Sequence, residues 1–169
     1  MKSRIFLIGF MGSGKTTLGK RLARRMGYTF ADMDQEIEDT SGMTIPGIFR
    51  EHGEEVFRKW ERDILLELCK REKLIIATGG GAPCHSDLMD LMTACGLTVY
   101  LELPPEILKD RLLHARVERP LIKGKNEEEL LDYIQITLEK REVYYRRAEL
   151  IVEGVSPSLD ALVAALKSF

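Results

Sequence analysis

The chain has 169 residues, of which 44% are hydrophobic and 31% are charged, and its formal net charge at pH 7 is −2. This length and composition are typical of one globular domain with a buried core, which would span residues 1–169. The small negative charge gives no reason to expect nucleic acid or an anionic membrane surface as a partner.

The first expected element is a short apolar strand at residues 4–8, which leads directly into a glycine-rich stretch at residues 9–16. That stretch, GFMGSGKT, fits the phosphate-loop pattern G-x-x-x-x-G-K-[ST] at every fixed position. A helix is expected at residues 17–26, where apolar residues recur on one face. Glycines let backbone N–H groups turn toward an anion, and the helix N-terminus adds a favourable dipole. The stretch therefore predicts a site for nucleotide phosphates.

The phosphate-loop pattern also predicts roles for individual residues. We expect Lys15 to contact the β- and γ-phosphates of ATP, and the Thr16 hydroxyl to hold Mg²⁺. The other expected ATP contacts are Gly12, Ser13, Gly14 and Thr17. Mg²⁺ is thus the expected cofactor and ATP the expected co-substrate.

Downstream, the chain alternates apolar strands with helical patterns. Four more strands are expected, at residues 28–31, 74–77, 97–103 and 150–152. Helices are expected at residues 34–40, 45–71 with an interruption at Gly53, 86–94, from Pro105, from a cap at Asn126, and from Ser156-Pro157-Ser158. This alternation predicts an α/β fold: a five-stranded parallel sheet between two layers of helices.

Residues 114–125 differ from the rest of the chain because they carry basic side chains and little apolar pattern. We expect a mobile lid at about residues 112–125.

The carboxylates of Asp32 and Asp34 follow the second expected strand, near the end of the sheet where ligands bind in open α/β folds. One can hold metal-bound water and the other can accept a hydrogen bond from a substrate hydroxyl. Alternatively, both only stabilise a helix N-terminus.

The cellular location is predicted from two further observations. Three cysteines without a C-x-x-C pair favour free thiols in a reducing compartment, and no apolar run approaches the length of a membrane span. The N-terminal apolar run ends in the phosphate loop and not at a signal cleavage site. We expect a cytoplasmic monomer whose partners are small molecules.

A GTPase is disfavoured for two reasons. The D-x-x-G pattern at residues 39–42 of this chain lies in a helix-like stretch, and the guanine-binding pattern N-K-x-D is missing from the sequence.

The stretch at residues 32–61 resembles the shikimate kinase family. The family pattern D-x-D-x-x-I-E-x-x-x-G-x-x-I-x-x-I-F begins at Asp32 without a gap, and G-E-x-x-F-R-x-x-E follows from Gly53. Other shared motifs are T-G-G-G at residues 78–81, R-P-L at residues 119–121, and R-x-x-x-Y at residues 141–145. The resemblance covers essentially the whole chain. It implies a P-loop kinase fold that transfers the γ-phosphoryl of ATP to the 3-hydroxyl of shikimate, a step of chorismate and aromatic amino-acid biosynthesis.

The resemblance also implies where the substrates bind. Arg58 and Arg141 would hold the shikimate carboxylate, and Asp34 would bind the ring hydroxyls and orient or deprotonate the attacking one. Arg119, in the lid, would bind ATP and act with Lys15 on the transferring phosphoryl group. The backbone of Gly79, Gly80 and Gly81 would approach the substrate, and Asp32 would hold Mg²⁺ with Thr16, through water.

Several alternatives remain open at this stage. The adenine contact could be Arg111 or Arg116, and the later adenine loop at residues 153–157 matches the family pattern poorly. A related P-loop kinase for another small polyol acid, such as gluconate, would also need an arginine clamp. A binding protein that has kept only the fold is a third possibility.

Overall fold

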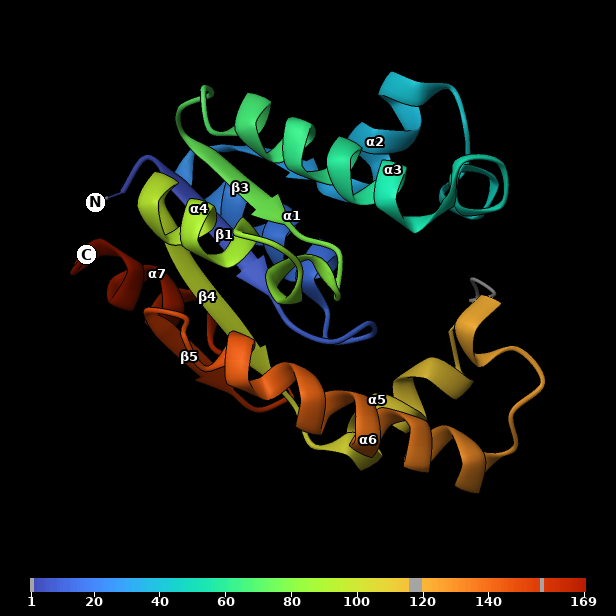
Figure 1. Ribbon diagram of the computed structural model, residues 1–169. Coiled ribbons are helices and arrows are strands. Elements are labelled where there is room, and N and C mark those ends of the chain that lie inside the picture. Colours follow the sequence, from blue (N-terminus) through green and yellow to red (C-terminus); the bar gives the residue numbers. More distant parts are fainter. Residues whose placement is uncertain (1, 116–119, 156) are drawn as a thin grey trace.

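The computed structural model describes residues 2–115, 120–155 and 157–169. Five parallel strands form one sheet in the order β2–β3–β1–β4–β5 (Figure 1). Their bounds are Arg4–Ile8 for β1, Thr29–Asp32 for β2, Leu74–Ala77 for β3, Leu97–Glu102 for β4 and Leu150–Glu153 for β5. The central strand is β1, and its Phe6 lies between Ile76 of β3 and Thr98 of β4. The glycine-rich loop therefore leaves the sheet from its middle.

Seven α-helices surround the sheet in the described part of the chain. They are α1 (Lys15–Met26), α2 (Met33–Ser41), α3 (Ile45–Leu68), α4 (Leu88–Cys95), α5 (Pro105–Leu113), α6 (Glu127–Tyr145) and α7 (Leu159–Lys167). Two short 3₁₀ turns, η1 (Ala82–Cys84) and η2 (Pro120–Ile122), lie in the connections. None of the helices in these described ranges combines the length and apolar character that a membrane crossing requires.

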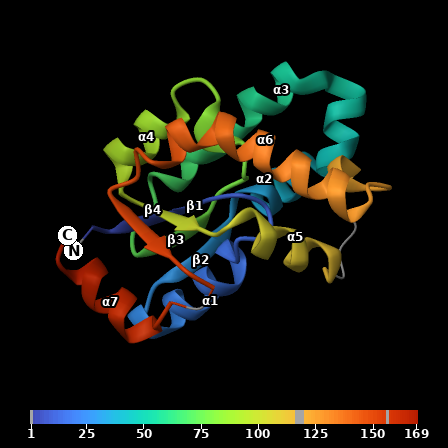
Figure 2. The same ribbon diagram turned by 90° about the horizontal axis from the view of Figure 1, so that it is seen from below.

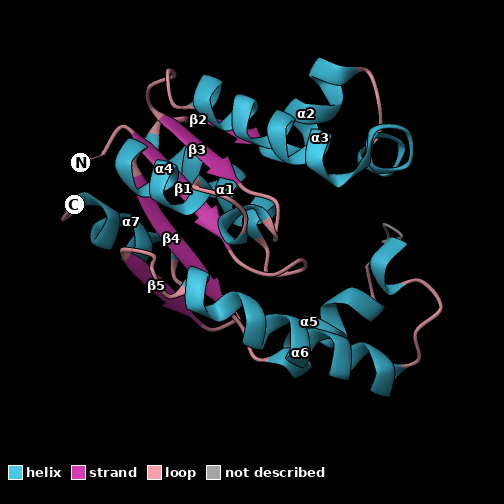
Figure 3. Ribbon diagram, viewed as in Figure 1, coloured by secondary structure: helices cyan, strands magenta, loops and turns pink. Residues whose placement is uncertain are grey.

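The sheet is buried on both faces, and side chains alternate between the faces along each strand. Ile5 and Leu7 of β1 pack with α1 and α7, whereas Phe6 and Ile8 pack with α3, α4 and α6. Figure 2 shows these two groups of helices on opposite sides of the sheet, and Figure 3 distinguishes the strands from the helices by colour. The predicted three-layer α/β architecture with five parallel strands is confirmed.

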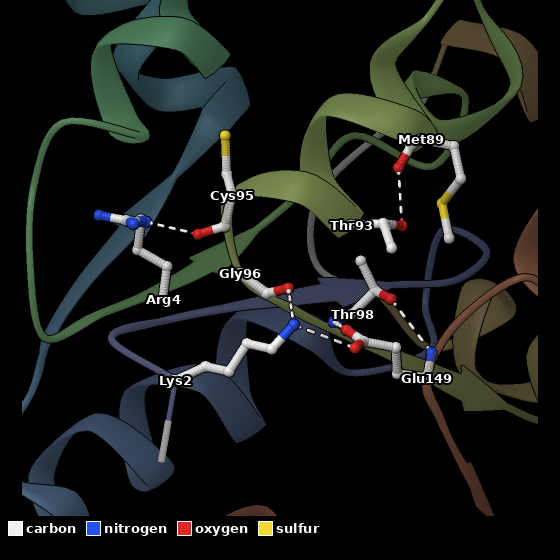
Figure 4. A network of polar contacts seen from close by, with 8 residues as sticks. All are labelled: Lys2, Arg4, Met89, Thr93, Cys95, Gly96, Thr98 and Glu149. Carbon is white, nitrogen blue, oxygen red and sulfur yellow. Dashed lines mark hydrogen bonds and ion pairs between the residues drawn. The ribbon is translucent and has the colours of Figure 1, made fainter. Parts of the chain in front are cut away.

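A polar network stabilises the end of the sheet that is remote from the glycine-rich loop (Figure 4). The Thr98 N–H donates to Glu149 Oε2 at 3.2 Å, and the Glu149 N–H donates to Thr98 Oγ1 at 3.1 Å. Lys2 Nζ donates to Glu149 Oε1 at 3.1 Å and to the Gly96 carbonyl at 3.3 Å, and Arg4 Nε donates to the Cys95 carbonyl at 2.7 Å. These contacts fix the starts of β1, β4 and β5. The glycine-rich loop leaves the sheet at the opposite end.

The predicted helix cap at Asn126 and the predicted interruption of α3 are both confirmed, and the cap is a capping box with Glu129. The Glu129 N–H donates to Asn126 Oδ1 at 2.9 Å, and the Asn126 N–H donates to Glu129 Oε2 at 3.0 Å. Gly53 has φ 80° and ψ 175°, in the region that glycine adopts without a steric penalty. The two segments of α3 on either side of Gly53 therefore run in different directions. Ile48 of the first segment and Phe57 of the second pack with Ile37 of α2 in a small core.

Three predicted helix boundaries are wrong. The helix expected at residues 86–94 begins at Leu88, because Ser86 has φ 51° and lies outside the right-handed helical region. The long helix expected to reach residue 71 ends at Leu68. The first helix begins two residues earlier than expected, at Lys15.

The predicted lid at about residues 112–125 is described only in part. Arg116 and Arg119 fall outside the described residues. In the flanking parts, Leu113 at the end of α5 and Leu121 in η2 expose 41% and 62% of their surface. The lid at about residues 112–125 therefore stays a prediction.

We expect amide hydrogen exchange in residues 112–125 to be fast in the free protein and slower when a nonhydrolysable ATP analogue and shikimate are both present. The reason is that a lid closing over the phosphates would bury its backbone and exclude water. Exchange measured by mass spectrometry on peptides from this region checks the prediction, with α7 peptides as the control. Equal exchange with and without both ligands would contradict a lid.

Candidate functional site

The phosphate loop, residues 9–14, connects β1 to α1. Gly12 and Gly14 have φ of 81° and 95°, so a side chain at either position would be strained. Lys15 Nζ lies over the loop and donates to the Gly9 and Phe10 carbonyls at 2.8 and 2.9 Å. Among the described residues, Ser13 Oγ is the only buried side-chain N or O atom without a hydrogen-bond partner. A loop with this backbone, a cation and an unsatisfied hydroxyl fits an anionic phosphate group.

Thr16 and Asp32 meet at the edge of this loop. Thr16 Oγ1 donates to Asp32 Oδ2 at 2.8 Å, while Asp32 Oδ1 accepts from the Asp34 N–H at 3.2 Å and caps α2. Capping and a metal role are therefore compatible for Asp32. Within the described ranges, no group of three or more His, Cys, Asp or Glu residues could hold a metal. A hydroxyl and one carboxylate suit Mg²⁺, which usually takes few protein ligands and completes its shell with phosphate oxygens and water.

The glycine turn after β3 lies directly against the phosphate loop. Thr78 is buried, and its N–H and hydroxyl both donate to the Leu7 carbonyl of β1, at 3.1 and 3.2 Å. A Cβ atom at Gly80 would lie 3.4 Å from the Met11 nitrogen and 3.5 Å from the Gly9 carbonyl oxygen. The nearest atom to that Cβ would be Arg141 Nη1, at 3.2 Å, so a side chain here would crowd Arg141. The glycine turn and the phosphate loop are thus in van der Waals distance of each other.

Three side chains predicted from the sequence to bind substrate are brought together around this turn. Asp34 Oδ1 is 3.0 Å from the position that a Cβ at Gly79 would take. The corresponding position at Gly81 is 3.5 Å from Arg58 Nη2 and 3.7 Å from Arg141 Nη2. The guanidinium of Arg141 also lies over the ring of Phe10, 5.7 Å from its centroid. One carboxylate and two guanidinium groups thus face the glycine turn beside the phosphate loop.

Glu61 fixes Arg58 and was given no role of its own by the sequence analysis. Arg58 Nη1 donates to Glu61 Oε2 at 2.7 Å, and only 1% of Glu61 is exposed. Burial raises the pKa of Glu61, while Arg58 lowers it. A second carboxylate, Glu54, lies 3.4 Å from Arg58 Nε on the exposed side. The spacing in the sequence could have indicated this ion pair, because Glu61 follows Arg58 by three residues and shares its helix face.

Tyr145 was likewise given no role of its own, and it fixes the glycine turn. Its hydroxyl donates to the Gly80 carbonyl at 2.5 Å, and its ring is fully buried against Tyr100, with centroids 5.0 Å apart. Burial raises the pKa of Tyr145, and Arg141 partly offsets the rise. Because Gly80 and Tyr145 are 65 residues apart, no local pattern could have predicted this contact.

Arg111 connects the phosphate loop to the loop after β5. Its Nη1 donates to the carbonyls of Gly12 and Ser13 at 3.3 and 3.1 Å, and its Nη2 donates to the Val155 carbonyl at 2.7 Å. A cavity of about 260 Å³ lies here, and its lining includes Thr17, Arg21, Arg111 and Val155. The structure thus places Arg111 beside the candidate nucleotide site.

A larger cavity, of about 930 Å³, lies between the ends of β4 and β5 and helix α6. Its lining includes four glutamates, Glu102, Glu139, Glu142 and Glu153. A negatively charged lining disfavours anions such as ATP or a carboxylate. The smaller cavity beside the phosphate loop is therefore the better candidate for the nucleotide.

Comparisons with known proteins identify the family of this chain. The sequence matches the shikimate kinase family over residues 11–167. It is 47% identical over 148 residues to shikimate kinase of Bacteroides fragilis, which covers 88% of this chain and 83% of that relative. A crystal structure of shikimate kinase from Bacteroides thetaiotaomicron has a TM-score of 0.92 and 41% identity, and the match covers 99% of this chain and 98% of the other.

A shikimate kinase from Acinetobacter baumannii, solved in complex with shikimate, has a TM-score of 0.83 and 36% identity, and the match covers 98% of this chain and 91% of the other. These similarities confirm the predicted P-loop kinase fold. The chain belongs to the shikimate kinase family.

Proposed function

We propose that the protein transfers the γ-phosphoryl group of ATP to the 3-hydroxyl of shikimate, giving shikimate 3-phosphate and ADP. The observation that supports this most directly is the placement of Asp34, Arg58 and Arg141 around the glycine turn, against the phosphate loop. Two guanidinium groups match a carboxylate, and one carboxylate matches a hydroxyl donor. Shikimate carries both an acid and neighbouring hydroxyls on one small ring.

Arg58 and Arg141 would orient the substrate by its carboxylate. The buried Glu61 holds the Arg58 guanidinium in a fixed direction, and the Phe10 ring supports Arg141. A clamp that is already ordered loses little side-chain entropy when it binds. Asp34, at the first turn of α2, would then accept a hydrogen bond from the attacking hydroxyl and orient it or take its proton.

Lys15 and the phosphate-loop N–H groups would bind the phosphates, and Arg119 would add a second cation from the lid. Mg²⁺ would neutralise part of the phosphate charge, with Thr16 and Asp32 as its protein ligands, Asp32 through water. Arg111 would contact the nucleotide at its adenine end, since it joins the phosphate loop to the 153–157 loop beside a cavity. Phosphoryl transfer depends mainly on such positioning and charge neutralisation.

We further propose that the protein works as a monomer in the cytoplasm, within chorismate and aromatic amino-acid biosynthesis. Cys69, Cys84 and Cys95 are free, as is usual for proteins of a reducing compartment. No observation favours gluconate as the acceptor. A binding protein without activity is disfavoured, because Lys15, Thr16 and Asp34 are all retained in the site.

We expect ADP release to depend on shikimate in a coupled assay that compares shikimate, quinate and gluconate at equal concentration, with ATP and Mg²⁺. Shikimate should be turned over at least about a hundredfold faster than gluconate, because a site built for a ring acid leaves polar groups unpaired with an open chain. The same assay without an acceptor measures the hydrolysis of ATP by water. Faster turnover of gluconate, or ADP release that needs no acceptor, would overturn the proposal.

A further inference from the structure

His85 lies beside the candidate carboxylate clamp. It follows η1 directly, and its N–H donates to the Ala82 carbonyl while its own carbonyl accepts from the Leu88 N–H, both at 3.3 Å. These bonds fix the backbone between the glycine turn and α4. Among the described residues, no hydrogen bond involves the His85 ring. The backbone of His85 is therefore fixed, while its ring nitrogens have no hydrogen-bond partner among the described residues.

Three nitrogen atoms from separate parts of the chain surround one point in space. The position that a Cβ at Gly81 would occupy is 3.5 Å from Arg58 Nη2, 3.7 Å from Arg141 Nη2 and 3.7 Å from His85 Nε2. Glycine leaves this position open. The three nitrogen atoms therefore lie near one another on the side-chain side of Gly81. Guanidinium and imidazole N–H groups are all hydrogen-bond donors that suit a carboxylate bound beside this glycine.

We propose that His85 is a third substrate-binding residue, whose Nε2 donates a hydrogen bond to the substrate carboxylate alongside Arg58 and Arg141. The inference rests on the proposed function, since it takes the acid of a shikimate-like substrate as the ligand. It assigns to His85 a contact that the two arginines leave available, because a carboxylate has about four acceptor positions.

The charge of His85 should then be linked to substrate binding. Burial lowers the pKa of His85, and the nearby Arg58 lowers it further, so the free protein carries a neutral imidazole at pH 7. A bound carboxylate favours the protonated form and raises the pKa of His85 in the complex. Substrate affinity should therefore rise as the pH falls through the pKa of the complex, and level off below the pKa of the free protein.

Other charged or titratable groups face this ring. They are Arg58, Glu54 and Arg141. Glu61 and Cys84 share this electrostatic environment, because Arg58 acts on both. Burial raises the pKa of Cys84 to about 11, so this group stays a neutral thiol over the useful pH range. The arginines stay charged. Glu61 and Glu54 are retained in every His85 variant, so a comparison among these variants removes their contribution.

The test is isothermal titration of shikimate, and separately of an ATP analogue, into wild type and variants from pH 5.5 to 8. His85→Ala should weaken shikimate binding about tenfold and leave the ATP analogue unaffected, as expected for one lost hydrogen bond to a charged group. His85→Gln places an amide nitrogen near the position of Nε2 and should restore binding to within about threefold of wild type. His85→Asn, whose amide nitrogen corresponds to Nδ1, should not.

Titration in buffers of different ionisation enthalpy measures protons taken up on binding. Wild type should take up protons near pH 6.5, and His85→Gln should lose His85's share of that uptake. His52→Gln, an exposed histidine outside the clamp, is the matched control and should bind as wild type does. Arg58→Ala is the reference for loss of one proposed guanidinium contact to the carboxylate.

Wild-type shikimate affinity in His85→Ala, or unchanged proton uptake in His85→Gln, would overturn the inference. If His85→Ala does not fold, the proton uptake of His85→Gln decides alone, because that variant keeps size and polarity. Failure of the wild type to bind or phosphorylate shikimate would instead overturn the proposed function. The two failures are therefore distinguishable.

Discussion

Lys15→Ala should reduce turnover by a factor of about a hundred to a thousand or more, the loss seen when one preorganised donor to developing charge is removed. Lys15 is the only basic residue within the phosphate-loop sequence at residues 9–16. Its ammonium already lies over the loop, where it donates to the Gly9 and Phe10 carbonyls. The measurement is kcat in the coupled ADP assay at saturating ATP and shikimate.

The fold should survive this substitution. Lys15 is at the first turn of α1, and the core contacts of that helix come from Leu18, Leu22 and Ala23. Lys20→Ala, which removes the same charge from an exposed site on the same helix, is the matched control and should keep wild-type turnover. Thermal unfolding of both variants separates a folding defect from a catalytic one. Turnover of Lys15→Ala within a few-fold of wild type would contradict the phosphate-loop assignment.

Features encoded by neighbouring residues could be predicted from the sequence. The phosphate loop, the capping box at Asn126 and the interruption at Gly53 each depend on backbone conformation or on bonds spanning a few residues. The sheet could also be predicted, because alternating apolar strands and helices permit few arrangements. The clustering of Asp34, Arg58 and Arg141 was anticipated through the family motifs rather than through periodicity.

Features that depend on contacts between distant residues could not be predicted in this way. The start of α4 was misplaced because the left-handed backbone of Ser86 has no glycine or asparagine to indicate it. Tyr145 reaches Gly80 across 65 residues. The position of the loop after β5 could not be predicted either, and Arg111 Nη2 donates to the Val155 carbonyl of that loop. Arg116 and Arg119 lie outside the described residues, so their predicted contacts stay predictions.

Asp34→Asn should separate catalysis from binding. A general base contributes about a hundredfold to ten-thousandfold to rate, so kcat should fall within that range. Shikimate affinity should change much less, because the amide keeps the size of the side chain and can still hydrogen-bond a hydroxyl. The change in kcat is measured in the coupled assay, and shikimate affinity by fluorescence of Trp60, the only tryptophan, two residues from Arg58.

Asp39→Asn is the matched control, because Asp39 lies on the same helix, is exposed, and among the described residues accepts one local bond, from Gln35 Nε2 at 2.8 Å. It should retain both kcat and affinity for shikimate.

Asp34 also raises the pKa of Glu61 through its charge, so Asp34→Asn should lower that pKa and leave the Glu61–Arg58 ion pair intact. A normal carboxylate clamp together with a large loss of kcat would assign Asp34 to the reacting hydroxyl. If affinity and kcat fell by equal factors, or kcat did not fall, the carboxylate would have no special part in phosphoryl transfer.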